Sequence, residues 1–65
     1  MKAGDLVKVA AKGLRTPIGS LGVITRVEER EDSRGTIVQY WAHMVESGHS
    51  FWFRLEYLEI INASR

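Results

Sequence analysis

The chain has no cysteine and only one proline among its 65 residues. Without cysteine there are no disulfides, no thiolate metal ligands and no thiol catalysis, so aliphatic and aromatic side chains must stabilise the fold. No window approaches the length of a membrane-spanning segment, and Asp5 and Lys8 interrupt the apolar run that a signal peptide needs. We therefore expect a soluble, cytoplasmic protein without a membrane partner.

An excess of one charge is also missing, because 9 basic residues face 8 acidic ones and the formal net charge is +1. A total this close to zero does not by itself indicate binding to a polyanion. The chain is 45% hydrophobic and 26% charged, which is the balance of a folded globular protein. Its length predicts a single small domain over residues 1–65, with a frayed tail at 62–65.

Alternating apolar and polar residues predict five strands. The alternation has a period of two and falls in segments rich in β-branched and aromatic residues, as is typical of half-buried strands. The predicted strands cover residues 5–11, 21–28, 36–44, 50–54 and 58–61. A tight helical turn at 55–57 leads into the last strand, for which a short helix is the alternative.

Turn-forming residues mark the connections between these strands. Segment 12–20 contains two glycines and the proline and predicts a long loop, whereas the charged segment 29–35 predicts an exposed hairpin loop. Ser47 and Gly48 predict a two-residue turn between the third and fourth strands. Five strands in so short a chain bury both sheet ends best by closing on themselves. We therefore predict an all-β fold, a small five-stranded, partly open barrel with a short helical turn before the last strand.

The spacing of glycines and valines has a counterpart in known barrels. The relevant segments are Gly4-Asp5-x-Val7-x-Val9, Gly19-x-x-Gly22-Val23 with Val27 after it, and Leu55-Glu56-Tyr57-Leu58-Glu59-Ile60. They resemble the Src-homology-3-like small barrels, especially the branch with a KOW-type signature in transcription and translation factors. The short chain is also similar to uncharacterised barrel proteins of bacteriophages, including phages of cyanobacteria. The resemblance implies a binding protein, which as a phage protein would reside in the host cytoplasm or the virion.

Catalytic chemistry has few candidate residues in this chain. Two histidines and no cysteine are present, and the eight carboxylates fall mostly in loops or on outward faces. His43 and His49 flank the predicted turn with Glu46 between them, but the predicted register separates the two histidines. The glycine-rich segment 13–22 lacks the ending through which a P-loop holds phosphate and magnesium. We predict no enzyme, no catalytic residue, no metal and no cofactor.

Tryptophan and arginine gather on one face of the predicted sheet. All six aromatic residues lie between positions 40 and 57. Pairing across the two-residue turn places Phe51 and Phe53 on the apolar face and both tryptophans on the opposite, outer face, which has no acidic residue. The predicted members of the outer face are Ile24, Arg26, Gln39, Trp41, His43, Trp52 and Arg54. Alternatively, the 12–20 loop folds over this face and buries Trp41 or Trp52.

These features give a leading hypothesis and two alternatives. Because tryptophan and arginine dominate interface hot spots, we predict that the outer face docks on a larger host or phage protein assembly, as a phage accessory or structural protein would. The first alternative is a KOW-like nucleic-acid-binding or transcription- or ribosome-associated protein. Its phosphate contacts would be Lys8, Lys12, Arg15 and Arg34. The second alternative is a homo-oligomer that pairs through a strand edge or the tryptophans.

Overall fold

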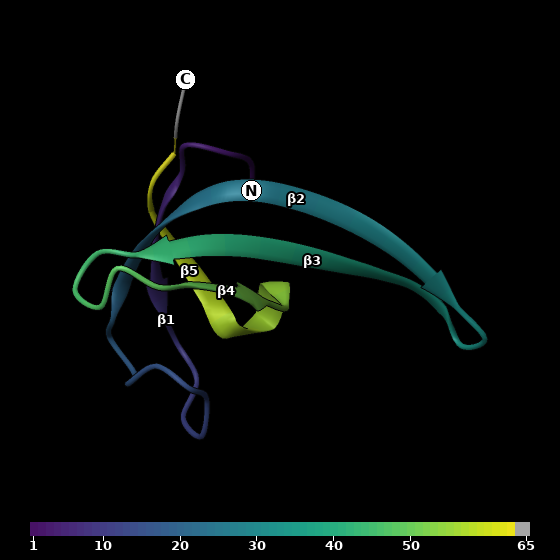
Figure 1. The fold of residues 1–65 in the computed structure, drawn as a ribbon, viewed down its shortest axis with the longest axis horizontal. Coiled ribbons are helices and arrows are strands. Elements are labelled where there is room, and N and C mark those ends of the chain that lie inside the picture. The colour runs from purple at the N-terminus through teal and green to yellow at the C-terminus, as the bar shows by residue number, and fades with distance from the viewer. Residues whose placement is uncertain (64–65) are drawn as a thin grey trace.

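Five antiparallel strands and one short 3₁₀ turn form the protein, seen in a computed structural model that describes residues 1–63 (Figure 1). Their bounds are β1 Leu6–Val9, β2 Leu21–Asp32, β3 Gly35–Met44, β4 Ser50–Phe53, η1 Leu55–Tyr57 and β5 Leu58–Asn62. The strands form one sheet in the order β4-β3-β2-β1-β5, so β4 and β5 are its edges. The predicted all-β, five-stranded, partly open barrel with a helical turn before its last strand is confirmed.

The core is built from alternate side chains of the strands, as the period of two requires. Its buried members are Val7, Val9, Ile24, Ala42, Met44, Phe53 and Leu58. The half-buried residues packed against them are Met1, Leu14, Tyr40, Phe51 and Tyr57. Leu14 belongs to the 12–20 loop, so this loop contributes to the core. The loop does not bury Trp52, which remains 41% exposed.

A β-bulge at Thr25 places its two neighbours, Ile24 and Arg26, on opposite faces of the sheet. Ile24 lies opposite Ala42 and Arg26 lies opposite Trp41, with the register shift between them. In a regular strand Ile24 and Arg26 would share a face, but the extra residue of a bulge breaks the alternation. Ile24 points into the core and is 1% exposed. The prediction that Ile24 belongs to the outer face is therefore wrong.

The connection between β3 and β4 spans residues 45–49, as the predicted strand bounds leave it, but the pairing is not centred on the predicted two-residue turn at Ser47 and Gly48. The pairing of the two strands is consequently offset by two residues, and Trp41 lies opposite Trp52 instead of Arg54. An even offset preserves the face on which each side chain lies. Both phenylalanines of β4 thus remain on the core face, as predicted.

β2 and β3 continue beyond the rest of the sheet as a two-stranded arm, residues 28–39 (Figure 1). Segment 29–35, predicted as a loop, is mostly paired strand, and the turn is closed by Arg34, whose N–H donates to Asp32 Oδ1 at 2.7 Å. Gly35 follows with φ of 126°, a conformation that side chains disfavour. No residue of the arm is buried, because only its own two strands pair there.

The ends of the chain differ from the predicted boundaries. Asn62 closes β5 opposite Leu6, so the predicted frayed tail at 62–65 is wrong at this residue, and residues 64–65 lie outside the described part. Before β1, Asp5 is buried and its Oδ2 accepts the Lys2 N–H at 2.9 Å. No described helix has the length and apolar character needed to span a membrane.

Candidate binding site

Arg26, Trp41 and Trp52 form a row across three strands on the outer face. Arg26 of β2 lies opposite Trp41 of β3, and Trp41 lies opposite Trp52 of β4. Cβ atoms of directly opposed residues are about 4.5–5.5 Å apart, so the three side chains are neighbours. Trp41 is half-buried and Trp52 is exposed. The even offset in register therefore brings the two tryptophans closer together than the predicted pairing does.

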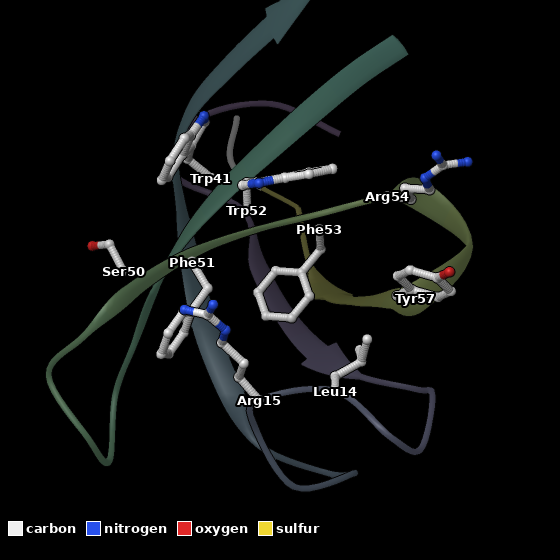
Figure 2. A pocket seen from close by; sticks show the side chains of 9 residues that line it. All are labelled: Leu14, Arg15, Trp41, Ser50, Phe51, Trp52, Phe53, Arg54 and Tyr57. Atoms are coloured by element: carbon white, nitrogen blue, oxygen red, sulfur yellow. The ribbon is translucent and has the colours of Figure 1, made fainter.

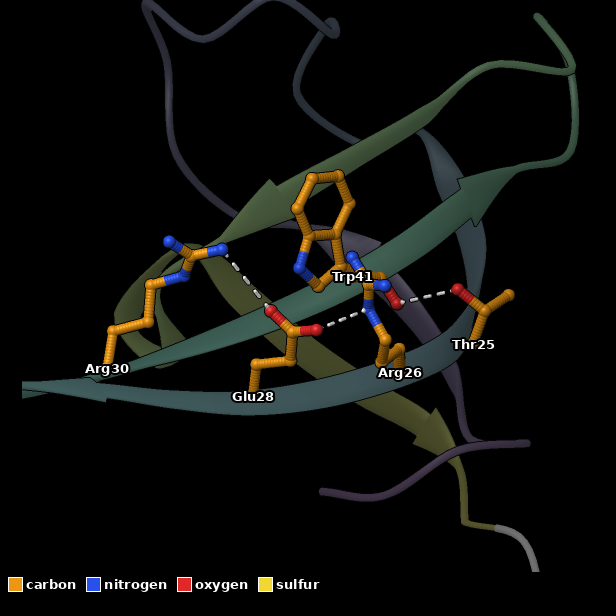
Figure 3. A network of polar contacts seen from close by, with 5 residues as sticks. All are labelled: Thr25, Arg26, Glu28, Arg30 and Trp41. Atoms are coloured by element: carbon orange, nitrogen blue, oxygen red, sulfur yellow. Dashed lines mark hydrogen bonds and ion pairs between the residues drawn. The ribbon is translucent and has the colours of Figure 1, made fainter.

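The arginine of this row is already engaged within the chain (Figure 3). The guanidinium carbon of Arg26 lies 4.8 Å from the centroid of the Trp41 ring, and its Nε lies 3.1 Å from Glu28 Oε1. The other carboxylate oxygen of Glu28 is 3.7 Å from the Arg30 guanidinium. Glu28 follows Arg26 by two residues on β2 and lies on the same outer face, so the prediction of an outer face without an acid is wrong.

Gln39 and His43 lie on the outer face but make local contacts only. The Gln39 side-chain oxygen is buried without a hydrogen-bond partner among residues 1–63, as is the indole nitrogen of Trp41. His43 lies opposite Ser50, with its Nδ1 3.3 Å from the serine hydroxyl. Neither Gln39 nor His43 lines the cleft described next. The outer face thus extends beyond the part of it that lines the cleft.

A cleft of about 400 Å³ runs along β4 between the 12–20 loop and η1 (Figure 2). Trp41 and Trp52 lie on one side of the β4 ribbon, and Phe51 and Phe53 lie on the other. The full lining is Leu14, Arg15, Trp41, Ser50, Phe51, Trp52, Phe53, Arg54 and Tyr57. Three of the predicted site residues, Trp41, Trp52 and Arg54, are therefore brought together here.

The cleft carries positive charge without any compensating acid. Arg15 and Arg54 are both exposed, and neither side chain forms an ion pair or hydrogen bond with another residue in the described part of the chain. Among residues 1–63, none with a carboxylate side chain belongs to the lining. Two unpaired guanidinium groups beside aromatic rings favour a ligand that carries acidic groups.

The four predicted phosphate contacts do not form one surface. Lys8 lies 3.7 Å from Glu59, its neighbour on β5. Lys12 and Arg15 belong to the 12–20 loop, whereas Arg34 lies in the turn at the tip of the arm, far from that loop (Figure 1). Of these four residues, only Arg15 lines the cleft.

Five lining residues were absent from the predicted site. They are Leu14, Ser50, Phe51, Phe53 and Tyr57. Sequence patterning assigns Phe51 and Phe53 to the core, which is correct, but the barrel is open beside β4 and the edge of the core is accessible there. The confinement of all aromatic residues to positions 40–57 was the signal for this cluster.

No protein-family model, no curated protein and no solved structure matches the chain. Across residues 1–63, no group of three or more histidines, aspartates and glutamates is placed to hold a metal ion. The most informative feature is therefore the cleft along β4 with its aromatic rings and unpaired arginines.

Proposed function

We propose that the protein is a non-catalytic interaction module, a Src-homology-3-like small barrel that docks on a larger protein assembly through the cleft along β4. The observation that carries this proposal is the lining, which combines five aromatic side chains and two unpaired arginines without a carboxylate. Aromatic residues and arginine are the types that dominate the energy of protein interfaces. The strand order and the 3₁₀ turn between β4 and β5 support the barrel type.

Trp52 is the best-placed anchor for such a partner. Its side chain is exposed at the cleft, while its neighbour Trp41 is half-buried and stacked under Arg26. A tryptophan presents a large apolar area with only two rotatable side-chain bonds, so its burial costs little conformational entropy. The setting we propose, from the resemblance to phage barrels, is a phage accessory or structural protein in the host cytoplasm or virion.

A KOW-like nucleic-acid binder is the second candidate, because stacked bases and phosphates also suit aromatic rings beside arginines. Single strands usually require a continuous basic groove that follows their backbone. Here Lys8 is paired with Glu59, and Arg26 and Arg30 flank Glu28. The remaining cations near the cleft are too few for such a groove, which favours a protein partner.

Affinity capture from a bacterial lysate, with and without nuclease, tests the proposed function. We expect wild-type protein to retain a nuclease-resistant protein partner, and Trp52→Ala to lose about tenfold or more of it, as hot-spot residues do. Ile18→Ala is the matched control, because Ile18 is an exposed apolar residue, at 53%, that does not line the cleft. Circular dichroism confirms that both variants are folded.

Two results would contradict the proposal. Recovery of nucleic acid, with proteins lost after nuclease and binding that falls steeply with salt, would favour the KOW-like candidate. A partner retained equally by wild type and folded Trp52→Ala would place the docking surface elsewhere.

A further inference from the structure

β4 is an edge strand, and its unpaired backbone groups border the cleft. Among the described residues it pairs with β3 alone. In an antiparallel pair, residues that hydrogen-bond to the neighbouring strand alternate with residues that do not. The Met44 N–H donates to the His49 carbonyl at 2.8 Å. By this alternation the backbone groups of Phe51 and Phe53 point to β3, and those of Ser50 and Trp52 point away from the sheet.

The space beside this edge continues past the cleft. A second hollow of about 380 Å³ lies at the other end of β4 and shares Arg15 and Phe51 with the cleft. Its lining includes Thr16 and Pro17 from the 12–20 loop and His49 from the turn before β4. Because the two hollows adjoin at Arg15 and Phe51 and residues of the 12–20 loop line both, we treat them as one groove beside β4. A groove of this form suits an extended chain.

The charged residues are distributed unevenly along this groove, with the arginines towards one end and an acidic residue at the other. Arg54 marks the end near η1, and Arg15 lies where the two hollows meet. In the described part of the chain, Glu46 is the only acidic residue in either lining, and it lies at the opposite end from Arg54. A ligand complementary to the groove therefore carries its carboxylates beside the two arginines and none beside Glu46.

We propose that the partner protein docks by adding an extended acidic segment to β4 as a further strand of the sheet. This inference rests on the proposed function and names its binding mode. The outward N–H and C=O groups of Ser50 and Trp52 need both an acceptor and a donor, which a peptide backbone supplies and a phosphate, as an acceptor, does not. Carboxylates of the added strand pair with Arg15 and Arg54, and its alternate side chains meet Trp52 and Phe51 across β4.

The probe is a peptide. It is selected from a displayed library of random ten-residue sequences for binding to the wild-type protein. We expect enriched peptides to contain aspartate or glutamate together with β-branched or aromatic residues, and to lack proline. The best peptide is then synthesised with N-methyl groups on one or the other set of alternate amides. Because alternate amides of an added strand face β4, one set weakens binding about tenfold or more and the other set has a much smaller effect.

A matched pair at Ser50 tests the same edge from the protein's side. Ser50→Pro and Ser50→Ala both remove the hydroxyl that contacts His43, but only proline also removes the outward N–H. We expect about fivefold weaker peptide binding for Ser50→Pro and a change within about twofold for Ser50→Ala. If Ser50→Pro fails to fold, the two N-methylated peptides still test whether the peptide binds to β4 as an added strand.

Charge reversal tests the acidic character of the segment. Arg54→Glu is expected to weaken peptide binding about tenfold or more. Arg34→Glu makes the same change at the tip of the arm and leaves binding unchanged.

Several results would overturn the added strand. Equal effects of the two N-methylated sets, together with wild-type binding by Ser50→Pro, would mean that side chains alone hold the peptide, while the lysate capture would still support the proposed function. Enrichment of basic peptides, or no enrichment, would contradict the acidic segment. An oligothymidine that displaces the peptide, or a dimer in sedimentation that Ser50→Pro dissociates, would identify a nucleic acid or a second copy as the occupant.

Discussion

The barrel and the arm are built from the same two strands, and they differ in what covers those strands. Up to the bulge at Thr25, β2 and β3 lie between β1 and β4 and bury Ile24, Ala42 and Met44. Beyond it, residues 28–39 pair only with one another, and none of them is fully buried. An isolated two-stranded hairpin is marginally stable in water. Stability therefore resides in the barrel, and the arm is the part expected to open first.

The two regions also use their arginines differently. At the arm, Arg30 and the neighbouring Arg26 both pair with Glu28, so each of these two arginines has an acidic partner within the chain. In the cleft, Arg15 and Arg54 have no such partner in the described structure. Charges that are satisfied internally contribute little to recognition, whereas unpaired ones beside aromatic rings are available to a ligand. This contrast supports the proposal that a partner binds at the cleft and not on the arm.

The largest effect on the free energy of unfolding is expected from truncating a side chain of the barrel core. Ile24→Ala should lower the free energy of unfolding by about 2–5 kcal/mol, because it leaves a cavity in a packed site. Val38→Ala truncates a half-buried β-branched side chain of the arm and should cost about 1 kcal/mol or less. Urea denaturation of the two variants measures both values. Equal losses would mean that the arm is as integral to the fold as the core.

An intermediate effect on the free energy of unfolding is expected at Gly22 of β2, where a side chain would meet Met44. A methyl group on Gly22 would lie 2.9 Å from Met44 Sδ and 3.2 Å from the His43 carbonyl oxygen. Gly22→Ala should therefore cost about 1–3 kcal/mol, since the buried Met44 must move. In the double variant Gly22→Ala, Met44→Ala, the loss should be smaller than the sum of the single losses. Additive losses, measured in urea, would rule out this contact as the cause.

The smallest effect is expected in the charged network at the base of the arm. Glu28→Gln removes the carboxylate that Arg26 and Arg30 share, and exposed ion pairs contribute about 0–1 kcal/mol. We expect a loss below about 1 kcal/mol that shrinks further in 1 M salt. Peptide affinity should stay within about twofold of wild type. A large loss of affinity would show that the arm belongs to the binding surface.

The architecture was predictable because it depends on alternation, which the sequence displays directly. Phe51 and Phe53 face the core and Trp41 and Trp52 face outward, even though the turn predicted at Ser47 and Gly48 gave the wrong register between β3 and β4. The error of two residues in register preserved every face on β4. Face assignments from alternation therefore hold when the register is wrong by an even number of residues.

The bulge could not be predicted in this way. Ile24 and Arg26 are two residues apart, and alternation alone assigns them to one face. The bulge at Thr25 is a property of three-dimensional pairing, where the threonine hydroxyl donates to the Trp41 carbonyl at 3.3 Å. It sends the apolar residue inward and the charged one outward, which the composition of the segment favours.

The arm was missed because its charges resemble those of a loop. Segment 29–35 carries acidic and basic residues that a buried strand excludes, but an uncovered strand can hold them on both faces. The signal lay on the partner strand, where Thr36, Ile37 and Val38 are β-branched and follow the turn at Gly35. Pairing with such residues extends the hairpin without any burial.

Amide hydrogen exchange, followed by NMR on the wild-type protein with and without the selected acidic peptide, tests most directly whether the edge of β4 is the binding site. Our account predicts that the backbone amides of Ser50 and Trp52 become protected when the peptide binds, because their N–H groups gain acceptors. Amides of the arm, residues 28–39, should exchange at the same rates in both samples. Protection in the arm with no change at Ser50 and Trp52 would contradict the account.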